Sequence, residues 1–148
     1  MYFLLLQIPS LLIILYYLWY GKSNNNIILN HYPKYKREEM CREILERHFN
    51  KPFPRVRPDF LKNPYTLRNL ELDCYNDELK IALEYCGYQH YNYPNPFHKS
   101  KEEFEQLKKR DKYKISTCKR LGIKLIIVPY WISDSELKDY ILSQIYNN

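Results

Sequence analysis

The N-terminal part of the chain lacks charge. Residues 1–20 contain no Asp, Glu, Lys or Arg, so the 23 basic and 17 acidic residues all lie between positions 22 and 148. Glycine is scarce, with 3 residues in 148. No period of about 20 to 50 residues recurs, which excludes a repeat array. A composition that is 45% hydrophobic and 16% aromatic excludes a disordered chain, because such side chains can offset the entropy of folding.

The uncharged segment itself is a long hydrophobic run. In residues 1–20, 17 side chains are apolar or aromatic. A helix of this length rises about 30 Å, which matches the hydrocarbon layer of a bilayer. Neither a basic n-region nor a small-residue cleavage site is present, which disfavours a cleaved signal peptide. We predict a single transmembrane helix; a buried N-terminal helix and a leader added to a soluble protein are the alternatives.

The residues after this run predict its orientation. Aromatic side chains collect at its end, as is typical of a membrane interface, and four basic residues follow: Lys22, Lys34, Lys36 and Arg37. The positive-inside rule then places the C-terminal part on the cytosolic side. Residues 21–34 are rich in Asn and predict a linker, so residues 35–148 form the expected domain.

Cysteine forms no C-x-x-C pair. The four cysteines are separated by 33, 12 and 32 positions, which disfavours a zinc ribbon: Cys41, Cys74, Cys86 and Cys118. We expect four reduced and largely buried thiols, as suits a cytosolic domain.

Hydrophobic periodicity predicts an α/β arrangement for this domain. Three helices are expected, at residues 35–49, 100–121 and 134–146. Four strands are expected, at residues 56–61, 69–75, 79–86 and 123–129. Pro58 makes the first of these an edge strand, and the apolar run of the last predicts burial on both faces.

Acidic residues concentrate on the hairpin predicted from the second and third strands. Asp73 and Glu84 lie almost symmetrically about its turn, and Glu71 shares a face with Asp73. Carboxylates this close repel one another unless something compensates, and hard oxygen ligands suit Mg²⁺ or Mn²⁺. Such a metal can activate water and stabilise a phosphoryl transition state. A solvated acidic face is the alternative.

Two helices add to this pattern. Glu38 lies on the apolar face of the first helix, where burial of a lone carboxylate is costly, although a first-turn position also favours a carboxylate. Residues 99–120 hold nine Lys or Arg against four acidic residues, including Arg110, Lys119 and Arg120. A basic helix beside a carboxylate–metal site suits a polyanionic backbone. A solvated helix face with i,i+4 pairs is the alternative.

Four stretches of the sequence resemble a known family: KREEMCREIL (36–45), PFPRVRPDFLKNPYTLRNLELD (52–73), EYCGYQHY (84–91) and RDKYKISTCKRLGIKLIIVPY (110–130). They resemble the restriction-endonuclease-like PD-(D/E)xK nucleases, in a small branch similar to very short patch repair endonucleases and found in large DNA viruses and bacteria. The resemblance implies an α-β-β-β-α-β core with a mixed central sheet flanked by helices.

The resemblance also implies roles for individual residues. Asp73 and Glu84 would bind the metal, and Glu38 would be the acid of the first helix. Gln89 and His90 would lie beside the site and orient water or phosphate, and Lys114 would face the nucleic-acid backbone.

One position departs from the family pattern. Cys86 stands third in the E-x-K element, where the fold usually has Lys and this branch often has Asp, Asn or Gln. Because cysteine supplies neither a positive charge nor a hard oxygen, either Gln89 substitutes or activity is reduced.

The sequence therefore predicts a membrane-tethered, Mg²⁺-dependent phosphodiesterase that acts on nucleic acid, with DNA favoured over RNA as the substrate. Two alternatives remain. One is a membrane-anchored module that binds nucleic acid without cleaving it, and the other is a membrane protein whose nuclease-like domain is a structural relic.

Overall fold

The computed structural model describes residues 36–147. The predicted transmembrane helix and linker, residues 1–20 and 21–34, lie outside the described residues. Within residues 36–147, no helix combines the length and the apolar character that crossing a bilayer requires.

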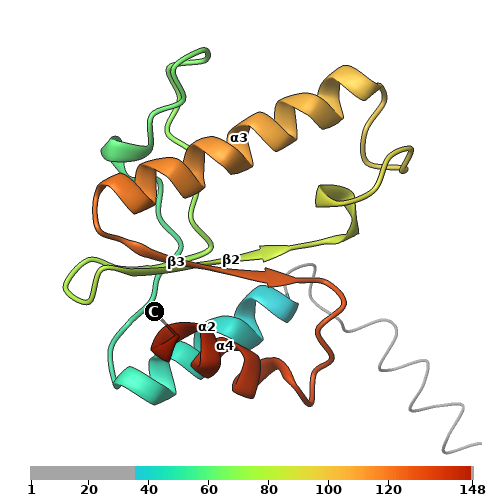
Figure 1. Ribbon diagram of the computed structural model, residues 1–148. Helices are drawn as coiled ribbons and strands as arrows, with labels where there is room; N and C mark the ends of the chain where they lie inside the picture. Colours follow the sequence, from blue (N-terminus) through green and yellow to red (C-terminus); the bar gives the residue numbers. More distant parts are fainter. Residues whose placement is uncertain (1–35, 148) are drawn as a thin grey trace, which may run out of the picture. The chain divides into compact units, whose positions relative to one another are not determined.

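The described part is an α/β protein built on a mixed three-stranded sheet (Figure 1). Its helices are α2 (Lys36–Phe49), α3 (Lys101–Arg120) and α4 (Leu137–Tyr146), with short 3-10 helices η1 (Asp59–Leu61) and η2 (Tyr88–His90). Its strands are β1 (Cys74–Asn76), β2 (Ile81–Cys86) and β3 (Lys124–Pro129). β2 is central; it pairs antiparallel with β1 and parallel with β3.

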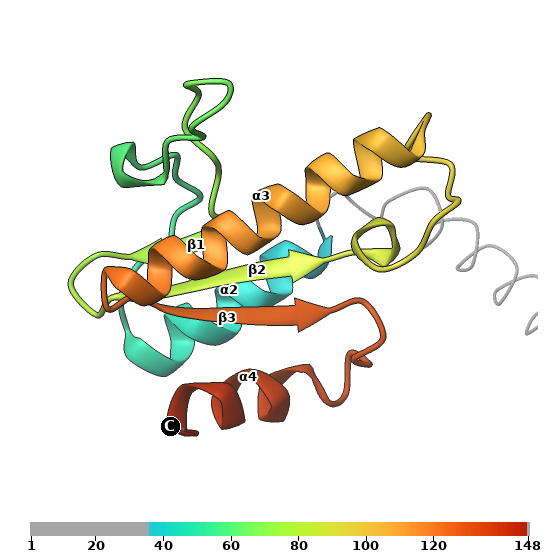
Figure 2. The ribbon, with the colours of Figure 1, turned by 45° about the horizontal axis from the view of Figure 1, so that its top comes forward.

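The helices cover both faces of the sheet. α3 lies over one face, and α2 and α4 lie under the other (Figures 1 and 2). Side chains of β2 alternate between the two layers, since Leu83 packs with Leu45 of α2 and Ile141 of α4, whereas Ala82 packs with Cys118 of α3. This period of two is the alternation that the sequence predicts for the strand at 79–86.

Local signals set the ends of α3. Ser100 is the N-cap, and its hydroxyl accepts from the N–H of Glu103 over 3.3 Å. At the other end, Gly122 has φ of +68°, and Ile123 N donates to Cys118 O over 2.9 Å. This is a Schellman ending, which glycine permits without strain. The predicted bounds of this helix are confirmed within one residue.

The region before the hairpin differs from its prediction. A strand at 56–61 is wrong: Val56 makes only an isolated bridge to Leu72, and residues 59–61 form η1. Pro58 explains the difference, since it has no N–H to donate to a ladder. The strand expected at 69–75 is likewise reduced to β1 with isolated bridges before it.

The predictions for the cysteines, the last strand and the last helix have different outcomes in the structure. All four cysteines are free and buried, as expected. Burial of the last strand on both faces is wrong, because Leu125 and Ile127 of β3 are half-buried and line a cavity beneath α3. The last helix begins at Leu137, later than expected.

Candidate active site

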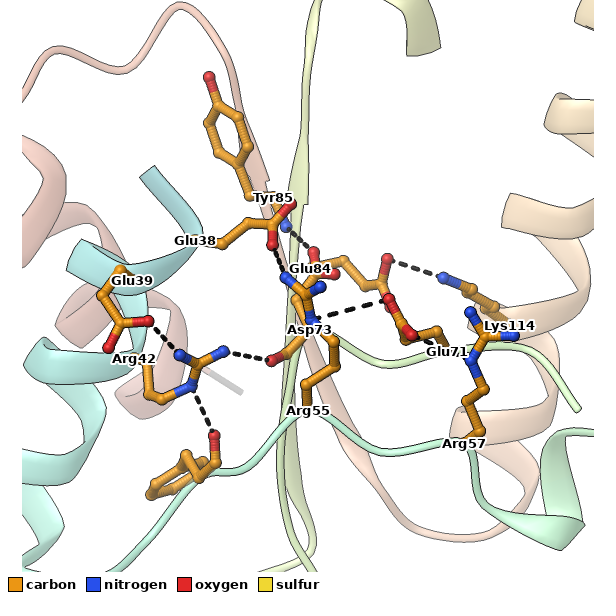
Figure 3. A network of polar contacts seen from close by, with 11 residues as sticks. Glu38, Glu39, Arg42, Arg55, Arg57, Glu71, Asp73, Glu84, Tyr85 and Lys114 are labelled. Carbon is orange, nitrogen blue, oxygen red and sulfur yellow. Dashed lines mark hydrogen bonds and ion pairs between the residues drawn. The ribbon is translucent and has the colours of Figure 1, made fainter. Parts of the chain in front are cut away.

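Asp73 and Glu84 meet at one end of the β1–β2 hairpin. The register pairs Cys74 with Leu83, so the next pair in the same register is Asp73 with Glu84. The backbone N–H of Tyr85 donates to Oδ2 of Asp73 over 3.0 Å, which fixes this carboxylate against β2 (Figure 3). The two acidic side chains that the sequence placed on facing arms are therefore neighbours.

Lys114 of α3 provides a cation at this position. Its Nζ donates to Oε2 of Glu84 over 2.8 Å (Figure 3). The two side chains are only 16% and 9% exposed. Removing either partner of such a pair leaves the other charge in poorly solvated surroundings, which is strongly unfavourable. Lys114, which the resemblance expects to face the nucleic-acid backbone, thus lies beside a carboxylate of the site.

A second group of charged side chains adjoins Asp73. Arg55 contacts the carboxylate of Glu38 from α2 and lies 3.7 Å from Oε1 of Glu71. Arg57 donates to the other oxygen of Glu71 over 3.0 Å (Figure 3). Glu38 therefore points inward from its helix, as its position on the apolar face predicts, and Arg55 compensates for its burial.

Burial shifts the ionisation of these carboxyl groups. The pKa of Glu84 rises from 4.5 to about 7, because burial outweighs the opposing effect of Lys114, and the charge of Asp73 adds to the rise. Burial also raises the pKa of Asp73, against the Tyr85 N–H and Lys114, and the pKa of Glu38, against Arg55. Several perturbed carboxyl groups in one place are typical of a functional site.

Glu84 has one oxygen that the described part of the chain leaves without a partner. Its Oε1 is buried and accepts no hydrogen bond from residues 36–147. Burying an unpartnered carboxylate oxygen is costly, and a divalent cation would satisfy it. Over the same residues, no group of three or more His, Cys, Asp or Glu side chains is arranged to hold a metal ion. Mg²⁺ needs only one or two protein carboxylates, since it retains several waters, so Asp73 and Glu84 fit it.

A cavity of about 140 Å³ opens next to Glu84, beneath α3. His90 of η2 and Asp111 of α3 line it, and His90 Nδ1 lies 3.0 Å from Asp111 Oδ2. A carboxylate at this distance fixes the ring orientation of a histidine. Lys108 holds the histidine backbone as well, through a 3.2 Å hydrogen bond to the His90 carbonyl oxygen. His90 is therefore a positioned group beside the carboxylates.

Neither Cys86 nor Gln89 replaces the lysine that the resemblance expects beside the carboxylates. Cys86 lines the same cavity, and burial raises the pKa of its thiol to about 12, so the thiol is neutral near pH 7. Gln89 is half-buried and folds against Gly87; a Cβ added to this glycine would lie 2.5 Å from Gln89 Oε1. Gln89 is not among the residues that line the cavity. The cation of this site comes from Lys114.

The other basic residues predicted on α3 fall into two groups. Arg110 is exposed and lines a groove of about 280 Å³ that also holds His90, Lys114 and Glu71. Lys119 and Arg120 are exposed in the last turn of α3 and line neither this groove nor the cavity. The structure thus brings Arg110 to the site and leaves the other two apart from it.

Sequence reasoning missed Arg55 and Asp111. Asp111 lies three positions before Lys114 on α3, and this spacing alone predicts that the two share a helix face. Arg55 lies in an irregular segment, where no periodicity indicates the direction of a side chain.

Comparison with known proteins gives relatives without an assigned activity. No protein-family model matches the chain, and no solved structure matches it. It is 41% identical over 110 residues to uncharacterized protein 033L of Invertebrate iridescent virus 3. It is 46% identical over 102 residues to uncharacterized protein 094L of Frog virus 3, and 42% identical over 112 residues to uncharacterized protein 307L of Invertebrate iridescent virus 6.

These matches cover 74%, 68% and 66% of this chain, respectively. The chain in turn spans 57%, 66% and 57% of the length of the three relatives. By sequence, it is similar to a group of uncharacterized viral proteins, each of them longer than the part it matches.

Proposed function

We propose that the domain is a metal-dependent phosphodiesterase with a restriction-endonuclease-like core, which cleaves nucleic acid, with DNA as the first candidate. The observation that carries this proposal is the surroundings of Glu84. Its carboxylate lies beside Asp73, contacts Lys114 through one oxygen and leaves its other oxygen buried without a partner among the described residues. A purely structural carboxylate would be expected to have both oxygens satisfied.

The donor set indicates which residues would hold the metal. Asp73 and Glu84 would bind Mg²⁺ or Mn²⁺, which when bound supplies a Lewis acid toward a phosphoryl oxygen. Arg55 and Arg57 keep the neighbouring Glu38 and Glu71 paired, so that repulsion between the carboxylates is reduced. Lys114 contacts Glu84 and would bring a positive charge to the position where a bound phosphodiester gains negative charge.

His90 has a role that its geometry supports. Its Nδ1 is occupied by Asp111, which leaves Nε2 as the nitrogen available to exchange a proton with substrate or water. Because the imidazole lines the same cavity as Glu84, proton transfer at this point would be close to the scissile phosphate. Basic residues of α3, Arg110 foremost, would hold the nucleic-acid backbone.

Cleavage by the full chain tests this function. Supercoiled plasmid and linear duplex DNA are incubated with the purified protein in Mg²⁺ or in EDTA, with Asp73→Asn as the variant. Asp139→Asn is the matched control, since Asp139 is an exposed carboxylate on α4, in the layer on the other face of the sheet. Cleavage that needs Mg²⁺ and Asp73, but not Asp139, supports the proposal. Cleavage that is unchanged both in EDTA and in Asp73→Asn overturns it.

A second function follows from Cys86. Its thiol is neutral and buried at the position where the family usually has lysine, which favours a protein that binds nucleic acid without cleaving it. Salt-dependent DNA binding by the wild-type chain, with no cleavage in either Mg²⁺ or Mn²⁺, would support this alternative.

Membrane tethering is a separate part of the proposal. Residues 1–20 would anchor the chain, with the domain on the cytosolic side. Cell fractionation of the full chain and of a form lacking residues 1–20 tests it. Recovery of both forms in the soluble fraction would exclude the anchor.

A further inference from the structure

The loop between η1 and β1 closes as a tight hairpin. Lys62 and Asn69 form a bridge at its base, and the N–H of Asn63 donates to Arg68 O over 2.9 Å. Asn63 is buried, and its side-chain oxygen accepts from the backbone N–H groups of Tyr65 and Thr66, over 2.8 and 3.2 Å. Residues 62–69 are therefore hydrogen-bonded within the loop, and its tip is turned away from the sheet (Figures 1 and 2).

The tip of this loop presents large side chains to solvent. Tyr65 is 84% exposed, the highest value among the large hydrophobic residues of the segment described, and Leu67 is 68% exposed, a value that Tyr146 equals. Leu67 also has φ of +56°, a left-handed conformation that is uncommon for a bulky residue. Strain of this kind persists where the surrounding structure enforces it, often at a contact surface. The loop thus keeps two apolar groups out of the core of the domain.

Positive charge lies in the loop and beside Tyr65. Lys62 and Arg68 belong to the loop itself. Across a pocket of about 260 Å³, which Tyr65 also lines, α3 contributes Lys109, Arg110 and Lys112. No carboxylate lines this pocket, and none of the three α3 cations forms an ion pair within residues 36–147. An exposed apolar tip with unpaired cations nearby is complementary to nucleic acid. Nucleic acid is a polyanion, and its stacked bases offer apolar surface between the phosphates.

The loop is connected to the candidate active site. The hydroxyl of Tyr113 on α3 donates to Lys62 O over 2.8 Å, which fixes the base of the loop to the helix. The groove of about 280 Å³ runs from Asn69 and Leu70, at the end of the loop, to His90 and Lys114. Nucleic acid lying in this groove would meet the loop at one end and the carboxylates at the other.

We propose that loop 62–69 is a wedge that inserts Tyr65 and Leu67 between the bases of duplex DNA held in the groove. Apolar side chains at the tip of a hydrogen-bonded loop would unstack a base step, while the neighbouring cations would hold the phosphates beside it. This wedge deepens the proposed nuclease function and rests on it for the identity of the ligand.

Fluorescence of 2-aminopurine tests the wedge, because this base brightens when it is unstacked. The full chain is titrated in EDTA with short duplexes that carry the analogue at successive positions. We expect wild-type protein to raise the fluorescence at one or two adjacent positions, and Tyr65→Ala/Leu67→Ala to lose that rise and to bind roughly 10-fold more weakly. Tyr146→Ala, which removes an aromatic ring that is 68% exposed at the end of α4, should behave as wild type.

Two further variants separate insertion from general charge attraction. Lys109→Gln/Lys112→Gln should weaken binding and lower its salt dependence, yet keep the fluorescence rise at saturation. Tyr65→Phe should keep it as well, since the ring remains. Circular dichroism of each variant verifies that the domain is folded.

The outcomes for the wedge and for the nuclease are distinguishable. Cleavage that depends on Asp73, without any fluorescence rise, would overturn the wedge and leave the nuclease. A rise that depends on Tyr65, without cleavage by the wild-type chain, would overturn the nuclease and leave the wedge. If the wild-type chain binds no duplex, or the rise persists in Tyr65→Ala/Leu67→Ala, the wedge is wrong, and a protein partner becomes the candidate for this surface.

Discussion

Lys114 Nζ lies 2.8 Å from Glu84 Oε2, although the two residues are 30 positions apart and belong to a helix and a strand. This contact places a positive charge beside the two carboxylates, whereas Cys86, two positions after Glu84, supplies none. α3 packs over β2 and β3, so Lys114 on its inner face can reach Glu84. In the family pattern, the lysine beside this carboxylate would instead come from β2 itself, at position 86. Four predictions follow from this contact and the residues around it.

Lys114→Met should reduce cleavage by about 100-fold, because the positive charge beside the reacting phosphate is lost. Lys114→Arg keeps a charge and should retain a larger share of activity. The control is Lys119→Met, which removes an exposed lysine from the same helix and should reduce activity less than threefold, a change of about 0.6 kcal/mol. Initial rates on duplex DNA in Mg²⁺ measure all three. Equal losses in Lys114→Met and Lys119→Met would show that Lys114 acts only through the general charge of the helix.

Cys86→Lys should partly restore cleavage in the Lys114→Met background. The new side chain would enter the cavity that Glu84 and Asp111 line, where a lysine meets two carboxylates. In the wild-type background, the same substitution brings a second ammonium near Lys114 and should give no gain. Rates of the single and double variants form a double-mutant cycle. Additive losses would mean that the two positions do not serve one site.

The stability of the domain should fall as pH rises through the range in which Glu84 ionises. Its pKa is raised on folding from 4.5 to about 7, so between these values the folded state binds more protons than the unfolded state. In EDTA, this group should therefore reduce the free energy of unfolding between about pH 4.5 and pH 7, by at most about 3 kcal/mol. Urea unfolding at several pH values measures this slope, and Mg²⁺ should reduce the loss, since a cation binds the ionised form.

Glu84→Gln provides the comparison for that slope. The variant cannot ionise at this position, so its unfolding free energy should decline less than that of wild type over the same pH range. Comparing slopes is preferable to comparing absolute stabilities, because the variant also leaves Lys114 without its carboxylate partner. Identical slopes in the two proteins would mean that Glu84 titrates at its ordinary pKa.

Asp111→Asn should reduce cleavage by about 10-fold, because the amide no longer orients the His90 ring as the carboxylate does at 3.0 Å. His90→Ala should reduce the rate further. Asp139→Asn again provides the control. Initial rates on duplex DNA in Mg²⁺ compare these variants, and circular dichroism gives the folded fraction of each. A rate in Asp111→Asn that falls only in proportion to its folded fraction would assign Asp111 a purely structural role.

Much of the fold follows from local patterns. The long helix α3 matches its prediction because both of its ends carry strong local signals, the cap at Ser100 and the glycine at 122. The hairpin is also predictable, since alternation along each arm and a short turn determine its register. The segment before it was not, because proline and isolated bridges replace a regular ladder there, and no periodicity describes such a path.

The sequence by itself determined that Asp73 and Glu84 would be neighbours and that Glu38 would point inward, because periods of 2.0 and 3.6 residues decide which side chains share a face. Only the tertiary structure decided which cation serves them. Lys114, Arg55 and the pair of His90 with Asp111 reach the site from separate elements, and their directions depend on how α3, η2 and an irregular segment pack on the sheet. Such packing depends on contacts between residues far apart in the chain, which local periodicity does not encode.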